Sequence, residues 1–189
     1  TQDGRLTAIS VPHSLATLWR TVNVHHPGVR NAFAAGVRSI LTRLTVHSFD
    51  HPIRLSRPVE ASAGFQLAHD RDPSGAVARV FMNVWCDVRG RGRRSPSDPS
   101  GGPVLAGQAF AEHTFTRLFA PPDQRRVLSL AGIEGYPEIP PAHYPQPAPR
   151  SAADAPQGAT WYDELAPDPV ETRFTLDQTD ANQHVNSHV

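Results

Sequence analysis

The sequence is poor in several residue types, and each shortage excludes a class of protein. Its 189 residues include one cysteine, Cys86, which excludes an internal disulfide framework. Acidic and basic residues number 18 each, so the chain lacks the positive surplus that non-specific nucleic-acid binding requires. No stretch approaches the roughly 20 apolar residues of a membrane span, and no secretory signal is visible. We therefore expect a cytoplasmic protein with no nucleic-acid partner and no membrane span.

Hydrophobic periodicity divides the first two thirds of the chain into a helix and several strands. Residues 6–18 are predicted to form a strand with a bend. Apolar side chains recur at three- and four-residue steps over residues 29–44, which predicts an amphipathic helix. Strand-like stretches follow at residues 53–69, 76–88 and 104–118. The second of these is the most apolar, so we expect it at the centre of a sheet, with Cys86 buried in it rather than reactive.

Turn and linker composition separates these stretches into domains. Residues 70–75 have the composition of a turn. Residues 89–102 are basic and rich in Gly, Ser and Pro, and a solvated loop is favoured there over a phosphate site. Pro, Ala and Gln dominate residues 135–170, which is typical of an interdomain linker. The sequence thus predicts a first domain over residues 1–134, and a second that starts within residues 171–189.

Acid–base groups gather in the last dozen residues. Asp180, Asn182 and His184 occupy alternate positions, so their side chains share one face of an extended segment. Asp177 would lie on the other face. Since Asp and Asn are also good helix N-caps, a purely structural capping role is the competing interpretation.

An earlier Asn-x-His pair echoes this run. Asn23 and His25 lie just before the predicted helix, and Asn182 and His184 lie just after the last predicted strand. The earlier pair has no acidic residue at the positions that correspond to the carboxylates of the terminal run. The neighbouring His26 does not make a metal site, because adjacent side chains on one segment point apart and no third ligand is suitably spaced. We expect no metal.

The terminal run resembles the signature of the acyl-ACP thioesterases of the hotdog superfamily, roughly Asp-x-Asn-x-His-Val-Asn-Asn. The matching residues are Asp180, Asn182, His184, Val185 and Asn186. Ser187 stands in place of the last Asn. The resemblance implies an α+β hotdog fold, in which an antiparallel β-sheet wraps one long central helix. It also implies two such domains in tandem, with the motif at the start of the second.

The function that the resemblance implies is hydrolysis of acyl thioesters, carried by acyl carrier protein or coenzyme A, in fatty-acid or polyketide metabolism. His184 suits proton transfer near neutral pH. Asp180 would act as the nucleophile or as the base that positions water, and Asn182 would orient either partner. No cofactor is implied. The residues expected to bind substrate are Asn23, His25 and Asn186.

Two other functions stay open on the same residues. The first is a non-catalytic acyl-thioester-binding protein or partner subunit. The second is an acyl-thioester dehydratase or hydratase, which the Asn-x-His-Val-Asn run favours less. The rest of a second domain would have to follow Val189, so two alternatives stay open: the chain is a fragment of a longer protein, or the remainder is a separate piece. An isolated first domain would expose a sheet edge, so we expect a homo-oligomer or pairing with a second hotdog domain.

Overall fold

The computed structural model describes residue 6, residues 10–54, 56–92 and 101–145, and Gly158. By internal contacts the chain divides into two compact units, residues 1–146 and 147–189. All described residues except Gly158 belong to the first unit, and the fold below is the fold of that unit. No helix among these residues is long and apolar enough to cross a membrane.

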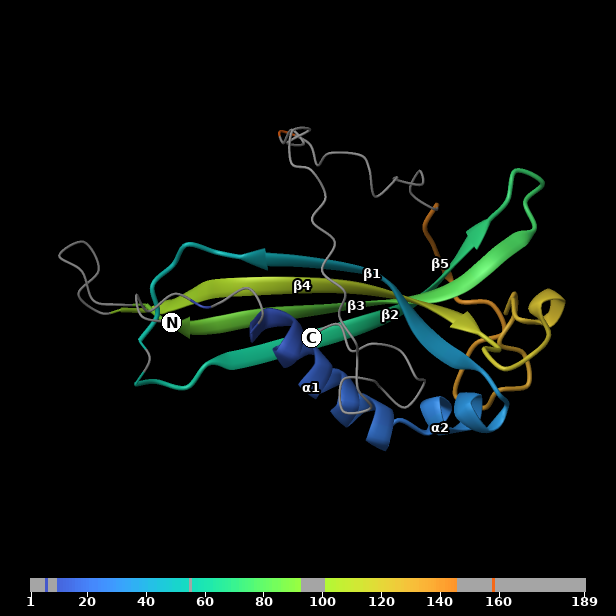
Figure 1. Cartoon of the computed structure of the whole chain (residues 1–189), viewed down its shortest axis with the longest axis horizontal. Helices are drawn as coiled ribbons and strands as arrows, with labels where there is room; N and C mark the ends of the chain where they lie inside the picture. The colour runs from blue at the N-terminus through green and yellow to red at the C-terminus, as the bar shows by residue number, and fades with distance from the viewer. Residues whose placement is uncertain (1–5, 7–9, 55, 93–100, 146–157, 159–189) are drawn as a thin grey trace, which may run out of the picture. The chain divides into compact units, whose positions relative to one another are not determined.

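A five-stranded sheet forms the body of the first unit (Figure 1). The strands are β1 (Arg38–Ser48), β2 (Glu60–Arg71), β3 (Val77–Arg91), β4 (Pro103–Thr116) and β5 (Ala142–His143). Their order across the sheet is β1-β4-β3-β2-β5. The four long strands pair antiparallel, whereas the short β5 runs parallel to β2, so the sheet is mixed.

Strand β3 is the middle strand, as its apolar sequence predicts. Every second residue of β3 is buried against the same face, because successive side chains of a strand point to opposite sides. The residues of this buried series are Val80, Met82, Val84, Cys86 and Val88. Cys86 is a buried free thiol whose pKa is raised by burial and by the charge of Asp87, so the expectation of an unreactive strand residue is confirmed.

Helix α1 (Ser10–His25) lies across this face of the sheet (Figure 1), which we call the helix face. Val11 and Leu15 are buried and Leu18 packs beside them, at the i, i+4, i+7 spacing of one helical stripe. Burying each such side chain stabilises the fold by roughly 2 kcal/mol. The chain after β4 adds Leu130 and Ile133 to the same core.

The predicted strand over residues 6–18 is wrong, because residues 10–25 form α1. The spacing of Val11, Leu15 and Leu18 is that of one helical stripe, and the structure follows it. Pro12 does not oppose it, because it lies in the first helical turn, where backbone N–H groups have no intrahelical acceptor.

The predicted helix over residues 29–44 is also wrong. Helix α2 (Pro27–Ala34) is short, and the chain turns at Gly36, whose φ of 75° is unfavourable for residues with a Cβ. Strand β1 then begins at Arg38 and pairs with β4 along its whole length. The apolar residues at helical spacing in this stretch are divided between α2 and β1.

The expected hotdog fold is therefore wrong for the described residues. That fold needs a long central helix wrapped by an antiparallel sheet. The helices here have 16 and 8 residues, and β5 makes the sheet mixed. The predicted central helix is not formed, because residues 38–44 of its predicted range belong to strand β1.

The three long strands predicted after residue 50 are confirmed, with bounds that differ by several residues. The predicted turn before β3 is also confirmed: the Asp72 carboxylate accepts hydrogen bonds from the N–H groups of Ser74 and Ala76, and Gly75 has a φ of 86°. Residues 135–145, the first part of the Pro-rich stretch, pack on this unit through buried Pro140 and β5.

Candidate functional site

The predicted catalytic residues lie outside the described residues. These are Asp180, Asn182 and His184, and Asn186 of the predicted substrate-binding set lies outside as well. Their roles stay predictions.

The earlier pair, Asn23 and His25, lies in the last turn of α1 rather than ahead of a long helix. His25 is exposed. The next residue, His26, caps α2 without a side-chain hydrogen bond and turns into the interior. The imidazole that packs inside is thus one residue beyond His25, and the substrate-binding role of Asn23 and His25 stays a prediction.

His26 belongs to a group of rings on the helix face that we call the imidazole–aromatic cluster. Its members are Trp19, His26, Phe65, His113, Phe115 and Tyr136. Trp19 stacks on His113 with ring centroids 5.7 Å apart, and it meets the edge of Phe65 at 6.4 Å. His26 lies 6.0 Å from Phe65 and 6.3 Å from Tyr136.

Five separate parts of the chain bring these rings together. Trp19 comes from α1, and His26 from the break between α1 and α2. Strand pairing sets Phe65 of β2 opposite Val84 and His113 of β4 opposite Met82, so both side chains are on the helix face. The loop after β4 carries Tyr136, whose ring packs on Phe115 at 5.8 Å.

Both imidazoles of the cluster have a buried ring nitrogen without a partner. The Nδ1 atoms of His26 and His113 make no hydrogen bond within the part of the chain that the structure describes. Buried polar atoms normally have partners, and an unpaired one costs about 1–3 kcal/mol. Such atoms are therefore expected where a ligand or an ordered water completes the bonding.

Burial also changes the acid–base chemistry of the cluster. It lowers the pKa of His113 to about 4, and the smaller opposing effect of the Glu112 charge does not restore it. Burial raises the pKa of the Tyr136 phenol. At neutral pH His113 and Tyr136 are both uncharged, and each can donate and accept hydrogen bonds. An apolar, ring-lined site with a few neutral polar groups suits an uncharged organic ligand.

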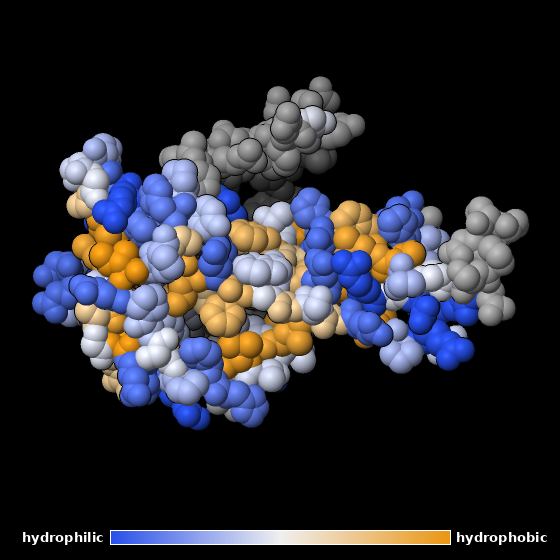
Figure 2. All heavy atoms as spheres, turned by 180° about the vertical axis from the view of Figure 1, so that it is seen from behind, coloured by the Kyte–Doolittle hydropathy of each residue, from blue (hydrophilic) through white to orange (hydrophobic). Residues whose placement is uncertain are grey.

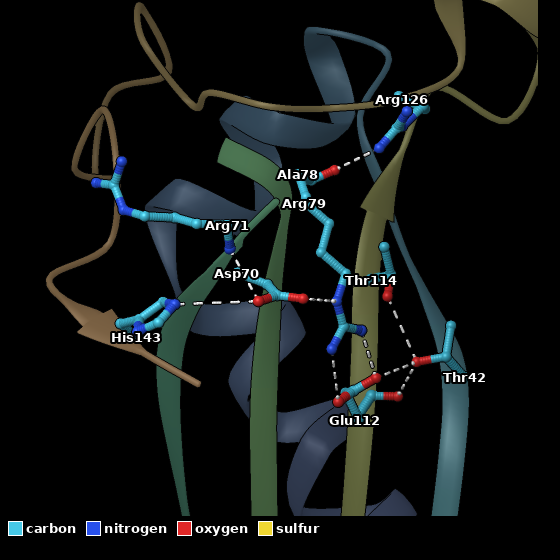
Figure 3. Close-up of polar contacts among 9 residues, drawn as sticks. All are labelled: Thr42, Asp70, Arg71, Ala78, Arg79, Glu112, Thr114, Arg126 and His143. Atoms are coloured by element: carbon cyan, nitrogen blue, oxygen red, sulfur yellow. Dashed lines mark hydrogen bonds and ion pairs between the residues drawn. The ribbon is translucent and has the colours of Figure 1, made fainter. Parts of the chain in front are cut away.

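A second polar group lies on the opposite face of the sheet. We call it the cross-strand row, since it takes one residue from each of the five strands in their spatial order (Figure 3). The row is Thr42, Glu112, Arg79, Asp70 and His143. Glu112 and His113 are adjacent in β4 and therefore point to opposite faces.

Charge compensation explains the cross-strand row. Arg79 donates to Glu112 at 2.7 Å and lies 3.8 Å from Asp70, while Thr42 donates to Glu112 at 3.0 Å. Burial alone would raise the pKa of Glu112, but the hydrogen bonds from Arg79 and Thr42 and the charges of Arg79 and Arg43 hold it below its usual value. The carboxylate is thus engaged in bonds across the sheet, and we assign this row to stability.

Large apolar side chains are exposed on both faces of the sheet. On the helix face, Phe65 is 40% exposed although it lies between Trp19 and His26, so one side of the cluster is open. Trp85 on the opposite face is exposed to a similar degree. Figure 2 shows hydrophobic side chains interspersed with hydrophilic ones on the side seen from behind.

Sequence reasoning overlooked His26 and His113 as site residues. His26 was considered only as a partner of His25 in a metal site. His113 shares its strand face with Ala109, Ala111 and Phe115, which are all buried. A histidine within a buried, small and apolar alternation was a signal that could have identified it.

Comparison with protein families, with curated proteins and with solved structures finds no match for this chain. The functional conclusion therefore depends on the residues and on the geometry given above.

Proposed function

We propose that this protein hydrolyses acyl thioesters of acyl carrier protein or coenzyme A. The observation that carries the proposal is the run Asp180-x-Asn182-x-His184-Val-Asn186, which resembles the acyl-ACP thioesterase signature. The run combines a carboxylate, a carboxamide and an imidazole at alternate positions, and these are the groups that activate and orient a water or a nucleophile.

In this mechanism His184 transfers a proton and Asp180 attacks the thioester carbonyl or positions the attacking water. Asn182 orients one of the two by hydrogen bonding.

Release of free thiol from octanoyl-CoA by the purified protein tests the proposal. We expect turnover by the wild type, and a loss of at least about 100-fold in kcat for His184→Ala, the lower end of the range for a general acid–base group. His188→Ala is the matched control, because it removes another imidazole four residues away and should keep wild-type activity. Wild-type turnover in His184→Ala would refute the assignment.

A second candidate function is binding of acyl thioesters without hydrolysis. The earlier Asn-x-His pair favours this function, because it has no carboxylate at the positions that match the terminal run. The pair also lies in a part of the chain that contributes rings to the cluster. Calorimetric titration with octanoyl-CoA separates the two functions: binding without release of thiol supports the second candidate.

A further inference from the structure

Strand β1 leaves one edge of the sheet unpaired. It is the last strand on its side of the sheet (Figure 1), and its inner side pairs with β4 over residues 38–48. No described residue pairs with its outer side. The backbone N–H and C=O groups that point outward from such a strand are a template for the addition of a further strand.

The other edge of the sheet, at β2, is less suited to take up a strand. β5 pairs with β2 at Ala68 and His69, and the hydroxyl of Tyr144 donates to Gln66, so part of this edge is occupied. The first five residues of β2 are small or acidic and offer little apolar surface. β1 instead combines apolar and β-branched residues and contains neither Pro nor Gly.

Two leucines of β1 are exposed beside its free edge. Leu41 pairs with His113 and Leu44 with Ala111, so both leucines lie on the helix face. Leu41 is 43% exposed and Leu44 is 39% exposed. A strand added to this edge would cover part of both side chains, and burial of apolar surface is the main driving force of protein association.

A β-bulge makes the two halves of β1 equivalent in the faces they present. The register with β4 shifts between Leu41 and Arg43, so Thr42 is the extra residue. Thr42 donates to the Glu112 carboxylate, which places it with Arg43 on the opposite face. Outward from this pair, one half of the strand begins on the helix face with Leu41 and the other with Leu44. Both halves then alternate in the same order.

We propose that two copies of this chain pair through β1, antiparallel, about a two-fold axis at the bulge. In this register Leu41 of each copy faces Leu44 of the other, and Ile40 faces Thr45. Every cross-strand pair then joins side chains on the same face. Other registers either shorten the pairing or set opposite faces against each other. The occupant of the edge is a second copy because the strand matches its own reverse, as a two-fold contact requires.

The charges and the backbone of β1 are compatible with this contact. In the proposed register Arg38 lies opposite His47, and Arg43 lies opposite Thr42, so no arginine faces another. Arg43 also has an acidic neighbour in its own sheet, since it pairs with Glu112. Antiparallel pairing over residues 38–47 makes roughly ten main-chain hydrogen bonds between the copies, which is the number in a typical protein interface.

Light scattering after size-exclusion chromatography of the full chain tests the pairing, and it needs no thioester, so the result is independent of the proposed hydrolysis. We expect the wild type to have twice the mass of one chain. Leu41→Glu/Leu44→Glu sets carboxylates opposite each other and should raise the Kd of the dimer by about 100-fold or more. Leu128→Glu is the matched control, because Leu128 is also 43% exposed but lies outside the strands, and it should keep the dimer. A monomeric wild type, or unchanged association of Leu41→Glu/Leu44→Glu, would overturn the inference.

Disulfide formation between two single variants tests the register, and it decides the question even if the glutamate variant does not fold. Co-expressed Leu41→Cys and Leu44→Cys chains should cross-link on mild oxidation, because opposite residues of an antiparallel pair lie about 4.5–5.5 Å apart, within reach of a disulfide. Either variant by itself should not, since its two cysteines would be three positions apart. Cys86 is buried and should not react. Leu41→Cys with Leu128→Cys is the control pair. No cross-link between Leu41→Cys and Leu44→Cys, or an equal yield in the control, would contradict the proposed pairing.

Discussion

Replacing His113 by Phe should change the dependence of stability on pH in a defined direction. The pKa of His113 is about 4 in the folded protein, against 6.5 for an unperturbed histidine. Between these values the unfolded chain binds a proton that the folded protein does not. The wild type should therefore lose stability as the pH falls through this window, and the Phe variant should lack this contribution.

The magnitude follows from the two pKa values. The difference of about 2.5 units corresponds to roughly 3 kcal/mol once the pH is below both values. At pH 5 the expected loss relative to pH 7.5 is about 2 kcal/mol. At pH 7.5, where His113 is neutral in both states, only packing and the unpaired Nδ1 distinguish the two proteins. We expect Phe to be tolerated there, because it replaces an unsatisfied buried polar atom with an apolar one.

Urea unfolding of both proteins at pH 7.5, 6.0 and 5.0 measures this effect. All other titrating groups are shared, so the difference in unfolding free energy between variant and wild type isolates His113. That difference should move in favour of the variant by about 2 kcal/mol from pH 7.5 to pH 5.0. A difference independent of pH would refute the argument that burial keeps this imidazole neutral.

Three further predictions concern other parts of the first unit. Glu112→Gln should lower the unfolding free energy measured in urea at pH 7 by about 3 kcal/mol, because it leaves Arg79 without its carboxylate partner. The loss should become smaller as the pH falls through the lowered pKa of Glu112. The double variant Arg79→Met/Glu112→Leu should recover at least half of that loss, and a double-variant loss equal to the sum of the two single losses would contradict the pairing. Gly64→Ala should cost about 1–2 kcal/mol and shift tryptophan emission to the red, because a Cβ there would lie 2.6 Å from the Trp85 ring, and unchanged emission would contradict that contact. Gly135→Ala should lower the thermal midpoint by several degrees, because φ is 90° and the Cβ would approach backbone at 2.9 Å; an unchanged midpoint would contradict this geometry.

The sequence was a good guide where one local pattern dominated. The apolar run of β3 predicted its central position, and the Asp72–Gly75 composition predicted the turn before it. It was a poor guide where two patterns competed. Residues 37–44 carry apolar side chains at helical spacing, yet Gly36 ends α2 and pairing with β4 draws the following residues into a strand.

For the candidate site, the sequence by itself determined which chemical groups are present and how they alternate along each segment. This was enough to single out Asp180, Asn182 and His184 as a functional hypothesis. Tertiary structure alone decided that His26 and His113 join one cluster. Their meeting depends on strand register and on the packing of α1 against the sheet, and a shift of one residue in β4 would have turned His113 to the opposite face. Local alternation is a property of neighbouring residues and can be read from them, whereas the contacts that bury a nitrogen are made by segments far apart in the chain.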